Sequence, residues 1–530
     1  MTQRKRRASN PQSRKAGTKE KVSPVVRESA IPKPDGLLEA KNQLKQARGS
    51  DSVLAAAKAV LQIEPTDPDA MDTLGQLQML KGHARDATET LARALFLQPN
   101  NEALLERYIR AAAKAGLHWD ALCVARHWVS IATEKPAAAT RLLAGLYGLI
   151  GKEDISRQWA YEAARLDPLS VAQATDQSQL SILVLSSIAS GSYIFQPKSG
   201  SLNTSEGHNN LPSLLDTMNT TRYRLHVDAI DEINATLKNL PKVDVIYNGI
   251  TDPERCRQAL VNADRLCERL YSGYGIPVIN NPKRVLECTR ENNAQRGADW
   301  EGVIVPKSVH LGLIDGEIGD TVRETARNHG LKEPIIMRAA GYQGGKNMHL
   351  IDDLENLKVR LQSPTEVYLI EYIDTQSDDG LFWKYRAFLV GEKLWPGSVI
   401  ASKEWVSNRA ASREDASLAE KMHQYQKVYQ EDPEQVIGTQ AWADLRNALI
   451  AIGLEYCGVD YGLSKEGYPV IFEANPAMRS ILPVADQHPE LVEAYTNIAH
   501  SVNSLFARKG GIDETTLAYR QEEEKPEYPK

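Results

Sequence analysis

Prolines recur at nearly constant spacing through the first third of the chain, within sequence that is dense in alanine and leucine. Pro65, Pro99, Pro136 and Pro168 are separated by 34, 37 and 32 residues. Apolar residues between them recur at helical spacing, and proline ends a helix because it lacks a backbone N–H. Each interval holds two helices, which bury their apolar faces only by stacking on neighbouring pairs. The spacing therefore predicts all-α helical repeats over residues 37–175.

The pattern inside the intervals resembles tetratricopeptide repeats, whose period is about 34 residues. Small residues stand where two helix axes would approach closely, at Gly75, Ala87 and Ala94, with Leu91 between them. Weaker copies follow Pro99 and Pro136. The resemblance implies three to four repeats with a concave surface that could take a peptide or protein partner. A plain helical bundle is the alternative.

Charge is unevenly distributed along the 530 residues. Residues 1–50 hold 13 Lys+Arg against 4 Asp+Glu, and since the net charge is −6, the other 480 residues carry −15. Because these 480 residues are acidic overall, we do not expect the chain to bind nucleic acids specifically. Residues 1–36 and 509–530 are poor in large apolar side chains, and we expect a disordered basic tail and a second disordered tail there.

The spacing of the cysteines and the hydropathy of the sequence indicate the cellular compartment in which the chain is expected to function. The five cysteines occur at no C-x-x-C spacing, which argues against a disulfide framework and a structural zinc site. The first twenty residues contain no apolar core of a secretory signal, and no run of about 18 apolar residues occurs. We therefore expect a cytoplasmic protein that does not enter a membrane.

The hydrophobic pattern changes after Pro168. Residues 181–187, SILVLSS, form a continuous apolar run of the kind found in buried parallel strands. Similar runs follow, separated in places by helical stretches at 254–271 and 440–452; the runs are 243–247, 303–305, 334–337, 367–370, 385–390, 461–463 and 470–472. The pattern predicts a multidomain chain in which an α/β (α+β) region follows the repeats, with an N-terminal lobe at 176–285 and further lobes at 286–508.

The most informative stretch is GVDYGLSKEGYPVIFEAN, residues 458–475. It reads as two strands joined by a short turn, with Asp460 on the first strand and Glu473 and Asn475 on the second. The i, i+2 spacing of the last two puts them on one sheet face. Carboxylate and amide oxygens are hard ligands of the type that Mg²⁺ takes when it bridges phosphates. A hairpin with surface acids is the alternative.

Four upstream features complete a candidate nucleotide site. A buried strand ends in Arg338 and runs into a glycine-rich loop, Gly341 to Gly345, followed by Lys346. Such a loop can bring backbone N–H groups against phosphate oxygens. The other features are the apolar strand VYLIEYID at 367–374, the alternating cations Lys384 and Arg386, and the arginines of NPKRVLECTREN at 281–292.

The order of these motifs resembles the ATP-grasp superfamily, which includes D-alanine:D-alanine ligase, glutathione synthetase and RimK-like ligases. The resemblance covers residues 180–508, and bacterial proteins are known that fuse a tetratricopeptide array to such a module. It implies that Mg²⁺ (or Mn²⁺) is bound by Asp460, Glu473 and Asn475. It further implies that ATP is held by Arg290, Arg338, the lid residues Gly341, Gly344, Gly345 and Lys346, and the adenine-contacting residues Glu371, Tyr372 and Ile373. Arg386 and Arg338 would act on the reacting phosphate.

Two departures from the family limit what carries over. Arg338 stands where many of these ligases have lysine, and Asn475 is followed by Pro-Ala-Met-Arg-Ser in place of the Pro-Gly-Met-Thr turn of the D-alanine enzymes. The acceptor substrate of those enzymes is therefore not transferred. Lys403, Asn408, Arg409 and Arg479 are candidates for recognising a substrate carboxylate; exposed loop positions are the alternative.

Together these features predict an ATP- and Mg²⁺-dependent carboxylate–amine ligase that works through an acylphosphate. The substrate would be a small molecule, an amino acid or a peptide, such as a precursor in natural-product biosynthesis. The chain could form a homo-oligomer. Two alternatives remain open: a scaffold that binds ATP without turnover, and a kinase on the same fold.

Overall fold

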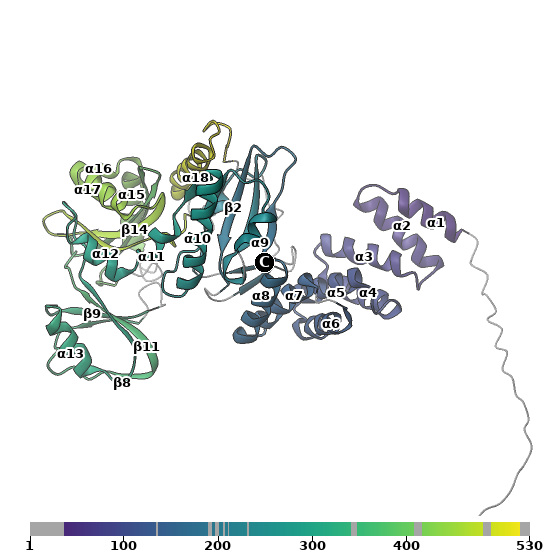
Figure 1. Ribbon diagram of the computed structural model, residues 1–530, viewed down its shortest axis with the longest axis horizontal. Helices are drawn as coiled ribbons and strands as arrows, with labels where there is room; N and C mark the ends of the chain where they lie inside the picture. The colour runs from purple at the N-terminus through teal and green to yellow at the C-terminus, as the bar shows by residue number, and fades with distance from the viewer. Residues whose placement is uncertain are drawn as a thin grey trace, which may run out of the picture. The chain divides into compact units, whose positions relative to one another are not determined.

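A computed structural model gives the fold of the chain (Figure 1). It describes residues 36–133, 136–188, 193–196, 201–204, 207–209, 211–230, 233–340, 347–406, 416–480 and 489–519. Residues 1–35 of the predicted N-terminal tail and the last eleven residues of the predicted C-terminal tail lie outside these ranges. Residues 510–519 are described, and Leu517 in this segment is buried. The chain divides into two compact units, 1–97 and 98–530.

The first unit consists of two helix pairs: α1 (Leu37–Gln46) with α2 (Ser50–Ile63), and α3 (Pro68–Leu80) with α4 (Ala84–Leu97). Helix α3 begins where the sequence favours a start, because the Asp67 side chain accepts from the Ala70 N–H at 2.8 Å and Pro68 occupies the first turn. A Cβ at Gly75 would lie 2.6 Å from Leu91 Cγ. Glycine at this position therefore permits the close approach of α3 and α4.

The second unit begins with two further pairs: α5 (Glu102–Lys114) with α6 (His118–Ile131), and α7 (Ala137–Leu149) with α8 (Glu153–Leu166). Pro65, Pro99 and Pro136 fall in or beside the connections between successive pairs, as the spacing predicted, and Pro168 lies between α8 and the strand that follows. Among the described helices of both units, none has the length and apolar character that a membrane span requires. The predicted fold class, helical repeats followed by an α/β region, is confirmed.

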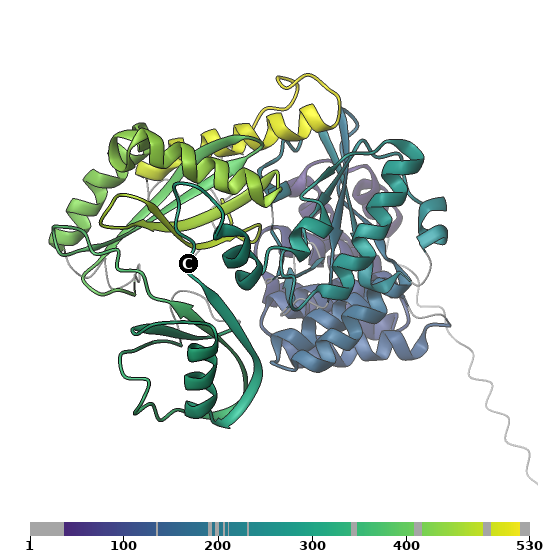
Figure 2. The same cartoon turned by 60° about the vertical axis from the view of Figure 1, so that its left-hand side comes forward.

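The sheet that follows α8 combines parallel strands with one antiparallel edge strand. Its order is β1-β5-β2-β6-β7, made of β1 (Leu169–Gln173), β5 (Thr220–His226), β2 (Leu180–Ser186), β6 (Val245–Asn248) and β7 (Val278–Ile279). Alternate residues of β2 serve two cores: Leu183 and Leu185 pack with α10 (Arg257–Tyr274), and Ile182 and Val184 pack with α18 (Pro489–Lys509). Figures 1 and 2 show these two helices beside the sheet.

Two antiparallel sheets complete the unit. The first has the order β10-β9-β11-β8, with β8 (Ser308–Glu317), β9 (Ile335–Ala339), β10 (Met348–Ile351) and β11 (Arg360–Glu371), and packs on α13 (Gly319–Asn328) around Val322 and Leu369. The second has the order β13-β12-β14-β15, with β12 (Phe382–Val390), β13 (Lys393–Ser402), β14 (Tyr456–Leu463) and β15 (Pro469–Asn475). Figure 2 shows them as separate lobes.

Several helices fix the second antiparallel sheet in place. Residues of α15 (Ala416–Glu431) and α17 (Thr439–Ile452) share a core with β12 and β14, and α16 (Pro433–Ile437) joins the two helices. Helix α18 packs on β12 as well as β2, through Phe388 and Val390. Short helices α11 (Pro282–Leu286) and α12 (Arg290–Gly297) precede β8. Residues 303–305, expected as a strand, make only an isolated bridge from Ile304 to Val470.

The helical repeats and the α/β region do not separate where the sequence suggested. Strand β1 lies inside the range 37–175 assigned to the repeats, yet it pairs with β5. Ala144 of α7 and Ala160 and Ala164 of α8 share a buried cluster with Ile188 and Ala229. The boundary between the two compact units of the chain falls after Leu97 and not after residue 175.

Truncation tests this arrangement. A chain that starts at Gln98 should melt close to the main transition of the full protein, because it keeps β1 and the alanine cluster. A chain that starts at residue 176 should melt several degrees lower or be insoluble, because both are lost. Thermal unfolding of the two purified chains measures this, and equal melting temperatures would contradict the shared core.

Candidate active site

Three adjacent strands bring charged side chains into one row. Arg386 on β12 is the register partner of Asp460 on β14, and Asp460 is the register partner of Glu473 on β15. Directly opposed residues in an antiparallel pair have Cβ atoms about 5 Å apart and lie on the same face. The register therefore places one cation and two carboxylates side by side across the sheet.

A β-bulge in β15 allows Glu473 to lie opposite Asp460 while Ile471 and Ala474 are both buried in the hydrophobic core. The pairing shifts after Asp460, so that Tyr461 pairs with Ile471 and Phe472 is the extra residue. As a result, Ile471 and Ala474 both join the buried core. Glu473 remains on the polar face, opposite Asp460.

Asp460 is the most buried member of the row, and its charge is fully compensated. Arg386 donates to both carboxylate oxygens, from Nε at 2.7 Å and from Nη2 at 2.9 Å, and Lys384 Nζ lies 3.3 Å from Oδ2. Burial alone would raise the pKa of the Asp460 carboxyl, but the charges and hydrogen bonds of Arg386 and Lys384 lower it below its ordinary value. Tyr429 supports this arrangement by donating to the Arg386 carbonyl at 3.0 Å.

Glu473 and Asn475 form the second part of the site. Arg290, at the first turn of α12, places Nη2 2.9 Å from Glu473 Oε2, and Asn475 Nδ2 donates to Glu473 Oε1 at 2.7 Å. The Asn475 Oδ1 accepts from the backbone N–H groups of Ala477 and Met478, both at 3.0 Å. The turn after β15 thereby fixes the orientation of Asn475.

The first antiparallel sheet contributes Arg338, a register partner of Tyr368, which is in turn the partner of His310. Burial lowers the pKa of Arg338, and the charge of Arg290 lowers it further, whereas Glu473 acts in the opposite direction. Arg338 is therefore within electrostatic range of Arg290 and Glu473, and we group the three as one electrostatic cluster. The Tyr368 hydroxyl donates to the Glu254 carboxylate, and its ring stacks on His310 with centroids 4.4 Å apart.

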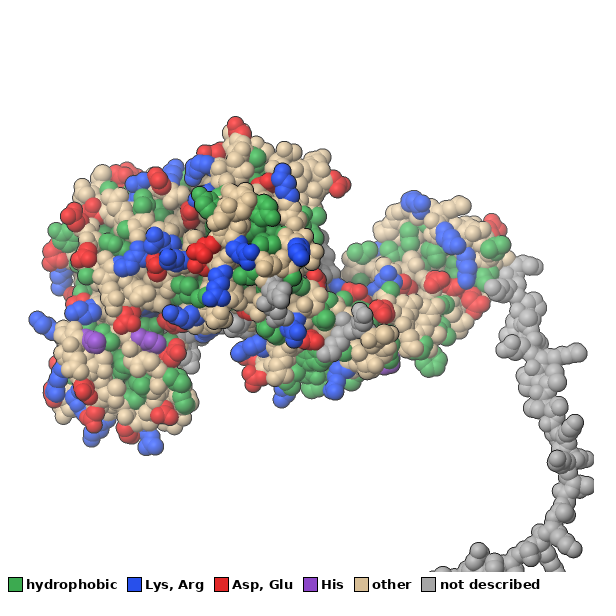
Figure 3. All heavy atoms as spheres, in the orientation of Figure 1, with side chains coloured by type: hydrophobic (Ala, Val, Ile, Leu, Met, Phe, Trp, Pro, Cys, Tyr) green, Lys and Arg blue, Asp and Glu red, His purple; other side chains and the backbone are tan. Residues whose placement is uncertain are grey.

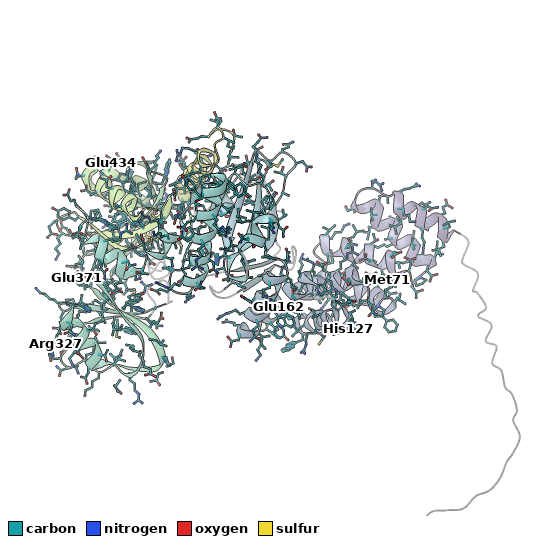
Figure 4. All side chains as sticks on the ribbon, viewed as in Figure 1. Met71, His127, Glu162, Arg327, Glu371 and Glu434 are labelled. Atoms are coloured by element: carbon teal, nitrogen blue, oxygen red, sulfur yellow. The ribbon has the colours of Figure 1, made fainter. Side chains whose placement is uncertain are left out.

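The expected adenine-contacting segment connects the two antiparallel lobes. Glu371 ends β11, and Figure 4 shows it between the lobe of β8–β11 and the lobe of β12–β15. Its backbone N–H donates to the Lys307 carbonyl at 2.8 Å, and its carboxylate accepts from the Lys307 N–H at 3.1 Å. The ring of the next residue, Tyr372, meets that of Trp405 edge-on at 6.2 Å. Ile373 is half-buried.

Some predicted residues are not placed with the cluster. Gly341, Gly344, Gly345 and Lys346, together with Asn408 and Arg409, lie outside the described residues. Lys403 is exposed. Arg479 donates to the His208 carbonyl at 3.5 Å, on the first α/β lobe. Their assigned roles stay predictions.

Three residues of the site were not found from the sequence. Glu254 lies in the connection before α10, and the sequence offers no motif that links it to Tyr368. His310 belongs to no motif in the sequence and has no partner at ligand spacing. Asn293 is buried on α12 beside β15, and the one available signal was its position three residues after Arg290.

The donor set fits a divalent cation in chemical type. Asp460 and Glu473 offer carboxylate oxygens from neighbouring strands, and a carboxylate oxygen that already accepts one hydrogen bond has a second lone pair. Asn475 Oδ1 accepts two backbone N–H groups and would have to release one of them to reach a cation. Among the described residues, no cluster of three or more His, Cys, Asp or Glu forms a metal site, so any cation here depends on two carboxylates and an amide. A surface cavity of about 640 Å³ lined by β10 and residues 351–360 contains none of the site residues.

Basic and acidic side chains are intermixed on the face of the molecule shown in Figure 3. Nothing on that face concentrates basic charge into a single field. The expectation that the chain does not bind nucleic acid specifically stays a prediction.

Comparisons with known proteins give two groups of solved structures. D-alanine–D-alanine ligase from Bacillus anthracis, complexed with ATP, matches 60% of this chain and 98% of its own at 13% identity with a TM-score of 0.31. VanG D-Ala:D-Ser ligase from Enterococcus faecalis matches 62% of this chain and 99% of its own at 14% identity with a TM-score of 0.33. MamA from Desulfovibrio magneticus RS-1 matches 26% of this chain and 78% of its own at 22% identity with a TM-score of 0.24.

No protein-family model matches the sequence, and no curated protein matches it. The solved structures agree in kind with the resemblance drawn from the sequence. At these identities and TM-scores they carry no argument about activity, and the account of the site rests on its own side chains.

A double-mutant cycle tests the central ion pair. Arg386→Met and Asp460→Asn each leave a buried charge without its main partner, so each should lower the free energy of unfolding, and the two effects should be coupled by roughly 1–3 kcal/mol. Because the folded-state pKa of Asp460 is lowered, the coupling should be present at pH 7 and fade as the pH falls below about 4.

The exposed pair Lys427–Glu431, separated by 3.8 Å, is the matched control. The cycle of Lys427→Met and Glu431→Gln should show coupling near zero. Equal coupling in the two cycles would show that the Arg386–Asp460 pair has no special role.

Proposed function

We propose that the chain is an ATP- and Mg²⁺-dependent carboxylate–amine ligase. The observation that carries the proposal is the row formed by Arg386, Asp460 and Glu473, with Arg290 paired to Glu473 and Arg338 in the same electrostatic cluster. Cations for phosphate oxygens and carboxylates for a metal thus meet at one place. This is the combination of charges that phosphoryl transfer from ATP requires.

Each part of the cluster has a distinct task in this proposal. Asp460, Glu473 and the Asn475 amide would hold Mg²⁺, which neutralises phosphate charge when it is bound. Arg290 and Arg338 would bind phosphate oxygens, and the planar guanidinium of Arg338 suits two of them at once. Arg386 and Lys384 would face the phosphoryl group that is transferred.

The reaction needs no side-chain nucleophile. An oxygen of the substrate carboxylate attacks the γ-phosphorus of ATP, and the bond from that phosphorus to the bridging oxygen breaks, giving an acylphosphate and ADP. An amine then attacks the acyl carbon, loses a proton and expels phosphate. The chain's residues position the reactants and neutralise charge.

We further infer that the substrate is an amino acid or a peptide. A repeat array offers a surface for an extended ligand, and in this chain α7 and α8 pack directly on the α/β region. A natural-product precursor peptide is a substrate of this kind. A homo-oligomer is compatible with this arrangement.

Loss of the metal-binding charge tests the proposal. Purified protein is incubated with Mg²⁺, ATP and mixtures of amino acids and dipeptides, and ADP release is followed. Glu473→Gln should lower ADP release by about 100-fold or more, because a ligand charge is removed from the position where phosphate charge must be balanced. The matched control Glu466→Gln, in the exposed turn of the same hairpin, should stay within twofold of wild type.

Mass spectrometry of the products separates the alternatives. The ligase yields a product whose mass equals the two substrates minus water. A stable phosphorylated product without condensation would support a kinase, and no ADP release from any mixture would support a scaffold. Glu473→Gln turning over ATP at the wild-type rate would remove Glu473 from the site.

A further inference from the structure

Strand β15, which carries Glu473 and Asn475, is an edge strand. In the order β13-β12-β14-β15, no further strand within the described residues pairs with its outer side. The backbone groups on such an edge need other partners. Residues 290–304 supply them.

The partners follow one another along the strand. The Ile304 N–H donates to the Pro469 carbonyl and the Ile471 N–H donates to the Ile304 carbonyl, both at 2.8 Å. Next, Arg290 Nη1 donates to the Phe472 carbonyl at 2.9 Å. Finally, Asn293 Nδ2 donates to the Ala474 carbonyl at 3.1 Å.

The last two contacts fall at specific peptide groups. The Phe472 carbonyl belongs to the peptide that leads into Glu473, and the Ala474 carbonyl belongs to the peptide that leads into Asn475. A planar peptide whose oxygen is held cannot rotate freely, so the direction of the following side chain is restricted. Each candidate ligand on β15 is therefore preceded by a clamped peptide.

Asn293 is suited to this task by its burial and its place on α12. Only 8% of the residue is exposed, and it lies three residues after Arg290, so both side chains face β15 from one side of the helix. Its Oδ1 is buried and finds no partner among the described residues. A buried polar group without a hydrogen bond costs free energy, and the Asn293 side chain bears this cost at Oδ1. We therefore attribute the presence of the amide to the hydrogen bond that its Nδ2 donates to the Ala474 carbonyl.

We propose that Asn293 is a positioning residue for the cation site: its amide fixes the Ala474 carbonyl and thereby the direction of Asn475, whose Nδ2 in turn orients the Glu473 carboxylate that would bind the metal. The inference rests on the proposed function. It adds a residue whose side chain bonds to the backbone of β15 and that is not among the residues assigned to the metal or the nucleotide. Outer residues that orient metal ligands typically change metal affinity by 10-fold to 100-fold when they are removed.

The experiment measures Mn²⁺ binding by electron paramagnetic resonance, with saturating non-hydrolysable ATP analogue. Asn293→Leu keeps the volume but removes the donor, and it should weaken Mn²⁺ binding by about 10-fold or more. Asn293→Thr keeps a shorter donor and should show a smaller loss. Asn292→Leu removes an amide from the neighbouring position of the same helix, whose side chain is half-buried, and should stay within twofold of wild type.

Two further readouts separate positioning from a structural role. The KM for Mg²⁺ in ADP release should rise more than kcat falls, and the metal-free melting temperature should not track the loss of Mn²⁺ affinity across the variants. Unchanged Mn²⁺ affinity in Asn293→Leu and Asn293→Thr, with wild-type protein binding normally, would overturn this inference alone. Wild-type protein that binds no Mn²⁺ with the nucleotide would overturn the proposed function and the inference with it.

Discussion

The buried pair between Arg386 and Asp460 is the constraint on which the rest of the site depends. Asp460 lies on β14, between β12 and β15, where an uncompensated carboxylate would be costly. Arg386 meets it with two hydrogen bonds, and Lys384 adds a second positive charge. Because the register that pairs Arg386 with Asp460 also places Glu473 opposite Asp460, the same strand alignment that satisfies one buried charge assembles the second carboxylate.

Both carboxylates of the cluster are paired with cations, and the cluster as a whole is positive, with Arg290, Arg338, Lys384 and Arg386 against Asp460 and Glu473. Arg290 neutralises Glu473, Arg386 neutralises Asp460, and Arg338 has its pKa lowered by burial and by Arg290. Arg290, assigned to phosphate oxygens, and Arg386, assigned to the transferred phosphoryl group, are thus the arginines that hold the carboxylates assigned to a cation. Phosphate oxygens that draw Arg290 and Arg386 away from the carboxylates would leave Glu473 and Asp460 without their counter-charges, and a divalent cation can replace those charges. This gives a physical reason for ATP and a divalent metal to bind as a pair.

Much of this arrangement could be predicted from the sequence, and the remainder could not for identifiable reasons. The period of the prolines gave the helical repeats, and the Glu473-x-Asn475 spacing on an apolar strand gave one face of the site, because both are local patterns. The bulge at Phe472 and the contacts of Asn293 and Glu254 depend on segments distant in sequence, which no local spacing reports. The boundary at 175 was misplaced because β1 is a half-exposed strand of five residues without a strong apolar pattern, and its pairing with β5 cannot be seen without the fold.

The most direct measurement is a crystal structure of the protein with Mn²⁺ and a non-hydrolysable ATP analogue, with data collected at the manganese absorption edge. The account predicts an anomalous peak within coordination distance of Asp460 and Glu473 oxygens, with the phosphates contacting Arg290 and Arg338. A nucleotide bound in the same crystal with the manganese peak away from both carboxylates would contradict it.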